Sequence, residues 1–186
     1  MKRFVVLVIA VLFVLFAAGT IYAADAVTVT VTMTGYVVNV DSTSWAIGTV
    51  TPSLDTVRQQ KSYVWNSGGV LMDVLLSATN TTNWKLRATA ARDTFQMRAL
   101  FSHKDTTGAP SEGSFAAEDT LTTGSAIEPN ATRYVWANGG LGTTTNGIPL
   151  DYGDSIGLWL YFKAPTTSSF NVPETLTVTV GSKVAD

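Results

Sequence analysis

The sequence predicts an all-β protein, a single antiparallel β-sandwich of about ten strands behind an N-terminal export signal. Three observations carry this prediction. Residues 27–34 alternate strictly between apolar and polar side chains, which is the period of a strand with one buried and one wet face. Short β-rich apolar segments follow, separated by turn-forming residues. Beyond the first residues, no segment has the convincing period of an amphipathic helix.

The start of the chain has the composition of a secretory signal peptide. Residues 1–3 carry a positive charge, residues 4–18 are an unbroken apolar run, and Ala24-Asp25-Ala26 fits the small-x-small cleavage pattern. We therefore expect a signal peptide at 1–24 and one mature domain at 25–186, secreted or at the cell surface. The alternative is an uncleaved membrane anchor, because the uncharged stretch 4–24 reaches the roughly 20 residues that span a bilayer.

The mature chain begins with an amphipathic strand at 26–34. Val27, Val29, Val31 and Met33 form its apolar face, and threonines form the other face. Such a terminal strand can pair within its own domain, beside residues 174–181, which show the same pattern. It can also be lent to a neighbouring copy, because the bonds made there copy those made at home.

The later strands are expected where apolar and β-branched residues cluster between turn signals. The expected ranges are 36–40, 44–50, 61–65, 70–78, 84–90, 95–101, 132–137, 155–163 and 174–181. Besides the three valines of the first strand, the residues expected in the core are Trp45, Leu75, Leu86, Phe95, Leu158 and Leu160. The polar stretch 102–130 is expected to cross one end of the sandwich as a long loop, held down by Phe115 and Leu121.

Charge and cysteine content limit the classes of partner. The formal net charge is -2, and it becomes -4 once Lys2 and Arg3 are removed with the signal. An acidic chain without a cluster of basic residues argues against nucleic acid and against docking to anionic lipid. The sequence has no cysteine, and about 160 residues can bury a sufficient core without disulfides.

No catalytic motif is present, and we do not expect an enzyme or a cofactor. His103 is the single histidine, which leaves no zinc ligand set and no histidine for a catalytic triad other than this loop residue. The loop carboxylates Asp119 and Glu128 are interpreted as solvated acids. Asp151 and Asp154 are the best fragment of a Ca²⁺ site, but they lack a full set of ligands, and we favour a turn that caps a strand.

Two kinds of carbohydrate contact are predicted. Trp65 and Trp136 each precede a glycine-rich turn, and at a sheet end they could stack on sugar rings; core packing is the alternative. Asn80 and Asn130 match the N-glycosylation sequon.

Residues 44–52 (SWAIGTVTP), 66–69 (NSGG) and 72–75 (MDVL) resemble bacterial secreted immunoglobulin-like modules, which carry an aromatic strand, an Asn-x-Gly turn and an apolar strand. The layout of signal, immediate β-strand and cysteine-free jelly roll is similar to TasA/camelysin fibre proteins. The resemblance implies an immunoglobulin-like or jelly-roll-like sandwich with a structural role at the cell surface.

Together these features favour a secreted, non-enzymatic structural protein, a fibre or matrix subunit that assembles with itself by β-strand addition. The alternative is a carbohydrate-binding module that recognises surface polysaccharide. Contact with a membrane is expected only through a retained signal anchor.

Overall fold

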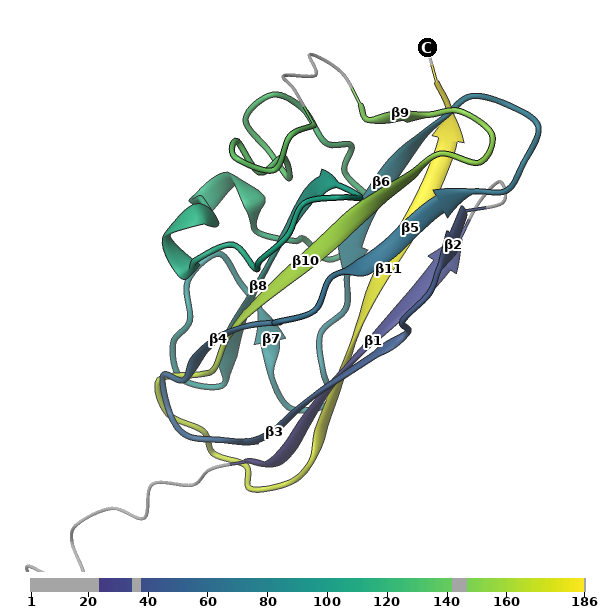
Figure 1. The fold of residues 1–186 in the computed structure, drawn as a ribbon. Helices are drawn as coiled ribbons and strands as arrows, with labels where there is room; N and C mark the ends of the chain where they lie inside the picture. Colours follow the sequence, from purple (N-terminus) through teal and green to yellow (C-terminus); the bar gives the residue numbers. More distant parts are fainter. Residues whose placement is uncertain (1–23, 35–37, 142–146, 186) are drawn as a thin grey trace, which may run out of the picture.

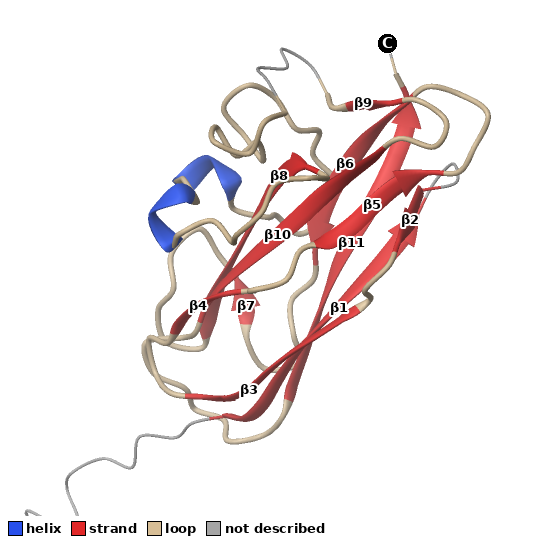
Figure 2. Ribbon diagram, in the orientation of Figure 1, coloured by secondary structure: helices blue, strands red, loops and turns tan. Residues whose placement is uncertain are grey.

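The computed structural model describes residues 24–34, 38–141 and 147–185, and these residues form an all-β protein (Figures 1 and 2). Their helical segments are two short 3-10 turns, η1 (Glu112–Ser114) and η2 (Ala117–Asp119). Residues 1–23, which hold nearly all of the predicted signal peptide, lie outside the described residues.

The strands form two curled sheets. Sheet A has the order β3 (Ser44–Val50), β1 (Ala24–Thr34), β11 (Glu174–Val184), β6 (Met72–Ala78) and β9 (Pro149–Leu150). Sheet B has the order β2 (Val38–Val40), β5 (Ser62–Asn66), β10 (Ser155–Lys163), β8 (Thr94–His103) and β7 (Lys85–Leu86). β4 (Asp55–Val57) also pairs with β10, beyond the part of β10 that pairs with β5.

Most neighbouring strands are antiparallel, as predicted, but two pairs are parallel. β1 runs parallel to β11, with Val27 opposite Glu174 and Thr34 opposite Gly181. β7 runs parallel to β8. Side-chain alternation reports which face of a strand is buried and carries no information on the direction of its neighbour, so the sequence could not show that these pairs are parallel. The pairing of β1 with β11 is the intramolecular alternative that the sequence offered for the first strand.

One apolar core lies between the sheets. Val27, Val29 and Val31 are at most 1% exposed, and the expected core residues Leu86, Phe95, Leu158 and Leu160 are also buried there. One expectation was wrong. Leu75 faces outward, because Met72, Val74, Leu76 and Ala78 are the core-facing set of β6. Trp45 packs against the core as expected, but it is only partly buried, since it lies on the edge strand β3.

A second apolar cluster covers the outer face of sheet B. Leu100 from β8 and Trp159 and Tyr161 from β10 pack there with Phe115, which follows η1. The long loop therefore lies over the outer face of sheet B, whereas we expected it to cross one end of the sandwich (Figure 1). β10 is consequently buried on both faces from Ile156 to Phe162.

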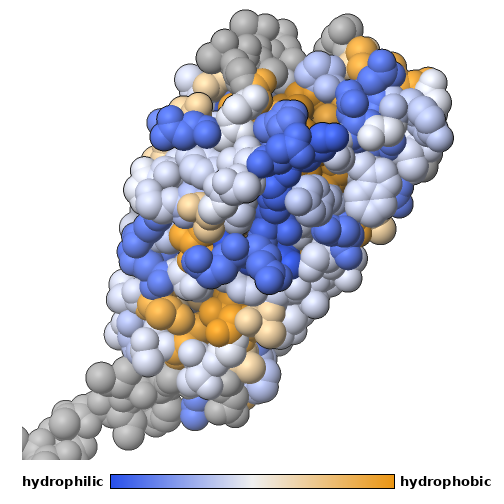
Figure 3. Space-filling view, viewed as in Figure 1, coloured by the Kyte–Doolittle hydropathy of each residue, from blue (hydrophilic) through white to orange (hydrophobic). Residues whose placement is uncertain are grey.

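Several strands differ in extent from their predicted ranges. Only Lys85–Leu86 of the range 84–90 forms a strand, and the range 132–137 contributes only isolated bridges, from Val135 to Phe101 and from Arg133 to Asn130. β4 and β9 were not predicted, because two or three residues are too short to show a period. The face in Figure 3 is mostly hydrophilic, with apolar residues in separate patches.

Candidate assembly groove

The candidate functional site is the groove that β1 fills between β3 and β11, here called the β1 groove. Its floor is the main core, into which Val27, Val29 and Val31 insert their side chains. Thr28, Thr30 and Thr32 lie on the opposite, half-buried face. The valines hold the strand by hydrophobic burial, worth roughly 1.5–3 kcal/mol for each fully buried side chain.

β11 forms one wall of the groove. Its parallel register with β1 runs without interruption from Val27 to Thr34. The threonine faces of the two strands also meet, since the Thr32 and Thr179 hydroxyl oxygens are 3.1 Å apart. A one-residue shift of β1 would move the valines to the outer face, so the register is strongly specified.

β3 forms the other wall and is less regular. It pairs antiparallel with β1, with register shifts on either side of Val27. Gly48 sits opposite Val27 with φ +81°, a left-handed conformation that favours glycine at such a bulge. Because β3 is at the edge of sheet A, β1 is its only strand neighbour among the described strands.

The beginning of β3 is held by a buried arginine. Arg58 is 7% exposed, and its guanidinium donates hydrogen bonds to the Ser44 carbonyl and to the hydroxyls of Ser42 and Ser62. Burial lowers the pKa of Arg58, and the nearby Asp41 carboxylate opposes this shift. These bonds position the chain where β3 begins beside β1.

The beginning of β11 is held by a buried carboxylate. Glu174 is 1% exposed, and its Oε1 accepts a 2.6 Å hydrogen bond from Asn83 Nδ2. Glu174 is also the residue opposite Val27. The hydrogen-bonded pair of Glu174 and Asn83 therefore lies at the end of the β1 groove that is next to Val27.

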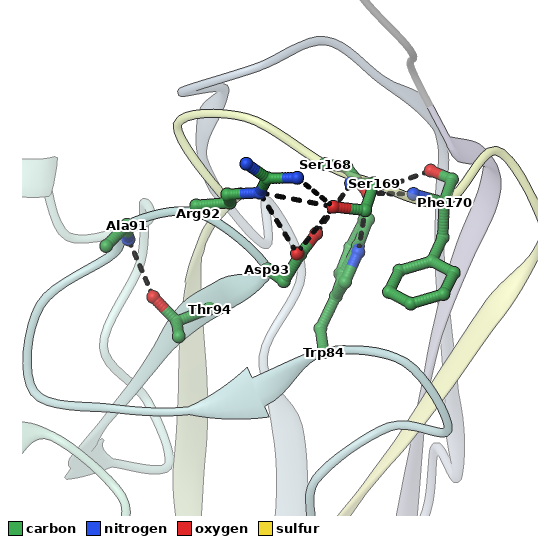
Figure 4. Close-up of polar contacts among 8 residues, drawn as sticks. All are labelled: Trp84, Ala91, Arg92, Asp93, Thr94, Ser168, Ser169 and Phe170. Atoms are coloured by element: carbon green, nitrogen blue, oxygen red, sulfur yellow. Dashed lines mark hydrogen bonds and ion pairs between the residues drawn. The ribbon is translucent and has the colours of Figure 1, made fainter.

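A polar cluster fixes the loop that leads into β11 (Figure 4). Asp93 accepts hydrogen bonds from the Ser169 backbone N–H at 2.6 Å and from its hydroxyl at 2.8 Å, and Arg92 also donates to this hydroxyl. Partial burial would raise the pKa of Asp93, but the Ser169 bonds and the Arg92 charge together hold it below its ordinary value. Beside it, Trp84 Nε1 donates to Ser168 Oγ.

One predicted member of the apolar stripe lies outside the groove. Met33 is 44% exposed, although it is paired with Val180 in register. The pairing of β1 with β3 ends at Thr30, opposite Ser44, so Met33 has a strand on one side only. The buried part of the predicted stripe therefore consists of three valines.

The two tryptophans predicted to bind sugar lie near sheet B and are both half-buried. Trp65 is on β5. Trp136 packs edge-on against Trp159, with ring centroids 6.2 Å apart, and its Nε1 is buried without a hydrogen-bond partner among the described residues. Trp136 therefore packs against the outer cluster.

The predicted calcium fragment forms a turn. The Asp154 N–H donates to the Asp151 carbonyl at 3.0 Å, and the Asp151 N–H donates to Asp154 Oδ2 at 3.3 Å. In the part of the chain that the structure describes, no group of three or more acidic, histidine or cysteine side chains could hold a metal ion. A Ca²⁺ site at Asp151 and Asp154 stays an untested prediction.

The remaining candidates are dispersed. His103 is at the end of β8, with its side chain 49% exposed and its Nδ1 3.5 Å from Asp105 Oδ2. Asn80 Oδ1 accepts a hydrogen bond from the Leu86 N–H, and Asn130 Oδ1 accepts from the Thr132 N–H in a local turn. None of these residues lies on β1 or on a wall of the β1 groove.

Sequence reasoning missed the buried charges that surround the groove. Arg58 lies between two predicted strands and Glu174 begins another, and only the folded chain brings them to their partners. Asp119 was read as a solvated acid, but it is 3% exposed. Single polar residues carry no period, so the sequence offers no signal for their burial.

No protein-family model matches this chain, and no curated protein matches it. The resemblance to immunoglobulin-like modules and to TasA/camelysin subunits therefore stays a prediction. Among the described residues, no helix is long and apolar enough to cross a membrane.

Proposed function

We propose that this chain is a secreted, non-enzymatic β-sandwich that serves as a fibre or matrix subunit at the cell surface. Copies are joined when β1 of one copy fills the β1 groove of another. The observation that carries the proposal is the position of β1: it is an inner strand of sheet A, next to the edge strand β3, and takes part in no hairpin. Its neighbours are β3 and the distant β11, whereas the next strand, β2, is in sheet B.

Because of this position, the exchange of β1 between two copies costs little free energy. Withdrawing β1 breaks only the pairs that β1 itself makes, and the same pairs form again in an identical groove. Main-chain hydrogen bonds supply affinity, and the valine positions supply the register. Exchange from copy to copy in one direction does not close on itself, so it builds an open chain of subunits.

The short connection to β2 restricts how two copies can lie. Four peptide steps separate Thr34 from Val38, and an extended chain covers at most about 3.6 Å per step, or about 14 Å in all. Val38 of the donor must therefore lie within this reach of the lent Thr34 in the acceptor. Donor and acceptor would then be adjacent at the end of the sheet where β1 finishes.

Deletion tests the proposal. A variant lacking residues 26–34 has an unfilled groove and no strand to lend, so we expect it to form no filaments by electron microscopy. A synthetic peptide of that sequence should restore a folded monomer, seen by circular dichroism, without restoring filaments. A matched peptide with Val27, Val29 and Val31 replaced by aspartate should not restore folding. Ordered filaments from the deletion variant would contradict strand lending.

A carbohydrate-binding module is the second candidate. A groove of about 530 Å³ opens beside Tyr63, which is exposed. Lys61, Gln60 and Asp41 supply polar groups around the groove. An accessible ring with polar neighbours is the composition of a sugar contact. Tyr63→Ala and Trp65→Ala should each reduce retention on insoluble polysaccharide, whereas the exposed Tyr152→Ala should not; equal retention of all variants argues against this function.

A further inference from the structure

Three ionisable side chains meet on the outer face of sheet A, near the end of β11. Asp73 on β6 and Lys183 on β11 are directly opposite each other in the antiparallel register. Opposite residues of such a pair share one face, with Cβ atoms about 4.5–5.5 Å apart. Glu128 belongs to residues 127–129, here called the covering segment, and its Oε2 is 3.1 Å from Lys183 Nζ.

The covering segment is anchored so that Glu128 stays over this pair. Ile127 exchanges two 2.8 Å backbone hydrogen bonds with Leu76 of β6, and the Gly147 N–H donates to the Pro129 carbonyl at 2.9 Å. Glu128 lies between these two attachments. Its position beside β6 is therefore set by the backbone and does not depend on its own flexible side chain.

The two carboxyl groups approach each other at Gly147. Asp73 Oδ1 and Glu128 Oε1 lie 2.3 and 2.6 Å from the point where a Cβ atom of Gly147 would be, so they are within about 5 Å of each other. Gly147 also has φ +71°, so glycine is required there both for its backbone and for the space it leaves. Asp73 is 4% exposed, and Glu128 Oε1 is buried with no hydrogen-bond partner among the described residues.

We propose that Lys183 and Asp73 form an intramolecular amide bond, with Glu128 as the proton acceptor. The three groups are those that the reaction needs: an amine, a carboxyl carbon on the adjacent strand, and a second carboxylate against the amine. Two closely placed carboxyl groups favour holding one proton between them, which supplies the neutral carboxylic acid that an amine can attack. The product would join β11 covalently to β6.

The atoms of the step balance without an oxidant or a second substrate. Glu128 takes one proton from the Lys183 ammonium, and the neutral Nζ attacks Cγ of the protonated Asp73. The C–N bond forms, the C–OH bond of Asp73 breaks, and its hydroxyl leaves as water with a second proton from nitrogen. Nitrogen keeps its third proton as the amide N–H, and Glu128 ends protonated.

A comparable ion pair in the same chain shows what the cluster adds. Lys163 and Asp55 are on paired strands, with Nζ and Oδ2 2.9 Å apart, and Tyr161 donates a hydrogen bond to this carboxylate. No second carboxylate forms an ion pair with Lys163 among the described residues. The Lys163–Asp55 pair therefore lacks the proton acceptor that Glu128 supplies, and it is the matched control.

Intact-mass spectrometry of the purified full chain tests the proposal. The protein should weigh one water less than the covalent mass of its own sequence, with the signal peptide accounted for from the N-terminal peptide. Proteolytic digestion should yield one branched peptide that joins Asp73 to Lys183. Lys183→Arg and Glu128→Gln should each restore the full mass, while Lys163→Arg should keep the loss of water.

Circular dichroism shows whether each variant is folded, and the branched peptide of the unchanged protein tests the bond without relying on any variant. Full mass in the unchanged protein, both fresh and after prolonged incubation, would overturn the proposal and leave an ordinary ion-pair cluster. A branched peptide that joins Lys183 to Glu128 would overturn the assigned roles. Loss of water that persists in folded Glu128→Gln would remove Glu128 from the reaction.

Discussion

At the scale of single residues, buried polar groups fix irregular backbone in this protein. Asp119 accepts hydrogen bonds from the Ala116 N–H at 2.7 Å and the Tyr134 N–H at 2.6 Å. Tyr134 has φ +61°, an uncommon conformation for a residue with a side chain, and its hydroxyl donates to the Thr120 carbonyl. Burial also raises the pKa of Tyr134 to about 12. Asp119 thus ties η2 to a distant part of the chain.

The first prediction concerns the pH dependence of this tie. Burial raises the pKa of Asp119 above its ordinary 3.8, although the two N–H donors oppose the shift. The folded state then binds the proton more tightly than the unfolded state. The contribution of Asp119 to the free energy of unfolding therefore falls as pH rises from the pKa of Asp119 in the unfolded state to its higher pKa in the folded state. In urea titrations, wild type should lose stability relative to Asp119→Asn between pH 3.8 and neutrality.

The matched control for this titration is Asp151→Asn, because Asp151 is exposed in a turn. Its difference from wild type should change little over the same range. A difference between wild type and Asp119→Asn that is flat or grows with pH would contradict the assigned direction.

At the scale of elements, β1 offers a test in which two faces of one strand are compared. Val29 is fully buried and its neighbour Thr30 lies on the outer face. Val29→Thr keeps the shape but buries a hydroxyl, and we expect it to lower the free energy of unfolding by roughly 1–3 kcal/mol. Thr30→Val should change it by no more than about 0.5 kcal/mol. Urea unfolding of both variants makes the measurement, and equal losses would contradict the register of β1.

The same scale shows what the sequence could predict. β3 and β10 have their predicted bounds, because seven or nine residues of apolar and β-branched sequence lie between clear turn signals. The range 132–137 does not form a strand: Tyr134 inserts into the main core, and Trp136 packs against the outer cluster. The residues of β4 and β9 are held by their neighbours and not by any pattern of their own.

The candidate site was predictable only in part. The burial of Val27, Val29 and Val31 follows from their alternation. The shared alternation of residues 27–34 and 174–181 also indicated that these strands could pair, but not that they run parallel. The bulge at Gly48 and the approach of Asp73 to Lys183 depend on which strands become neighbours. Long-range register is a property of the folded chain, so local sequence could not supply these features.

At the scale of the whole molecule, the outer cluster and the main core share strands. β8 and β10 place Phe95 and Leu158 in the main core and Leu100 and Trp159 in the outer cluster. The loop over sheet B therefore packs onto the same strands that form the floor of the core. We infer that the described parts of the chain unfold as one cooperative unit.

This inference gives the whole-molecule prediction. Far-ultraviolet circular dichroism reports the two sheets, and tryptophan fluorescence reports Trp84 in the core together with Trp159 in the outer cluster. The two signals should follow one denaturant transition with a common midpoint. A fluorescence change that precedes the loss of circular dichroism would show that the outer cluster opens separately.

The parallel pairing of β1 with β11 also decides how the domain carries mechanical load. Parallel strands begin at one end of the sheet and finish at the other, so Val27 lies beside Glu174 at one end and Thr34 beside Gly181 at the other. Tension applied to the start of β1 and to the finish of β11 acts along both strands in opposite directions. The hydrogen bonds of the pair are then strained together in shear, instead of opening one after another as in a peeled hairpin. A subunit pulled through these two points should therefore resist extension with the whole β1–β11 pair at once.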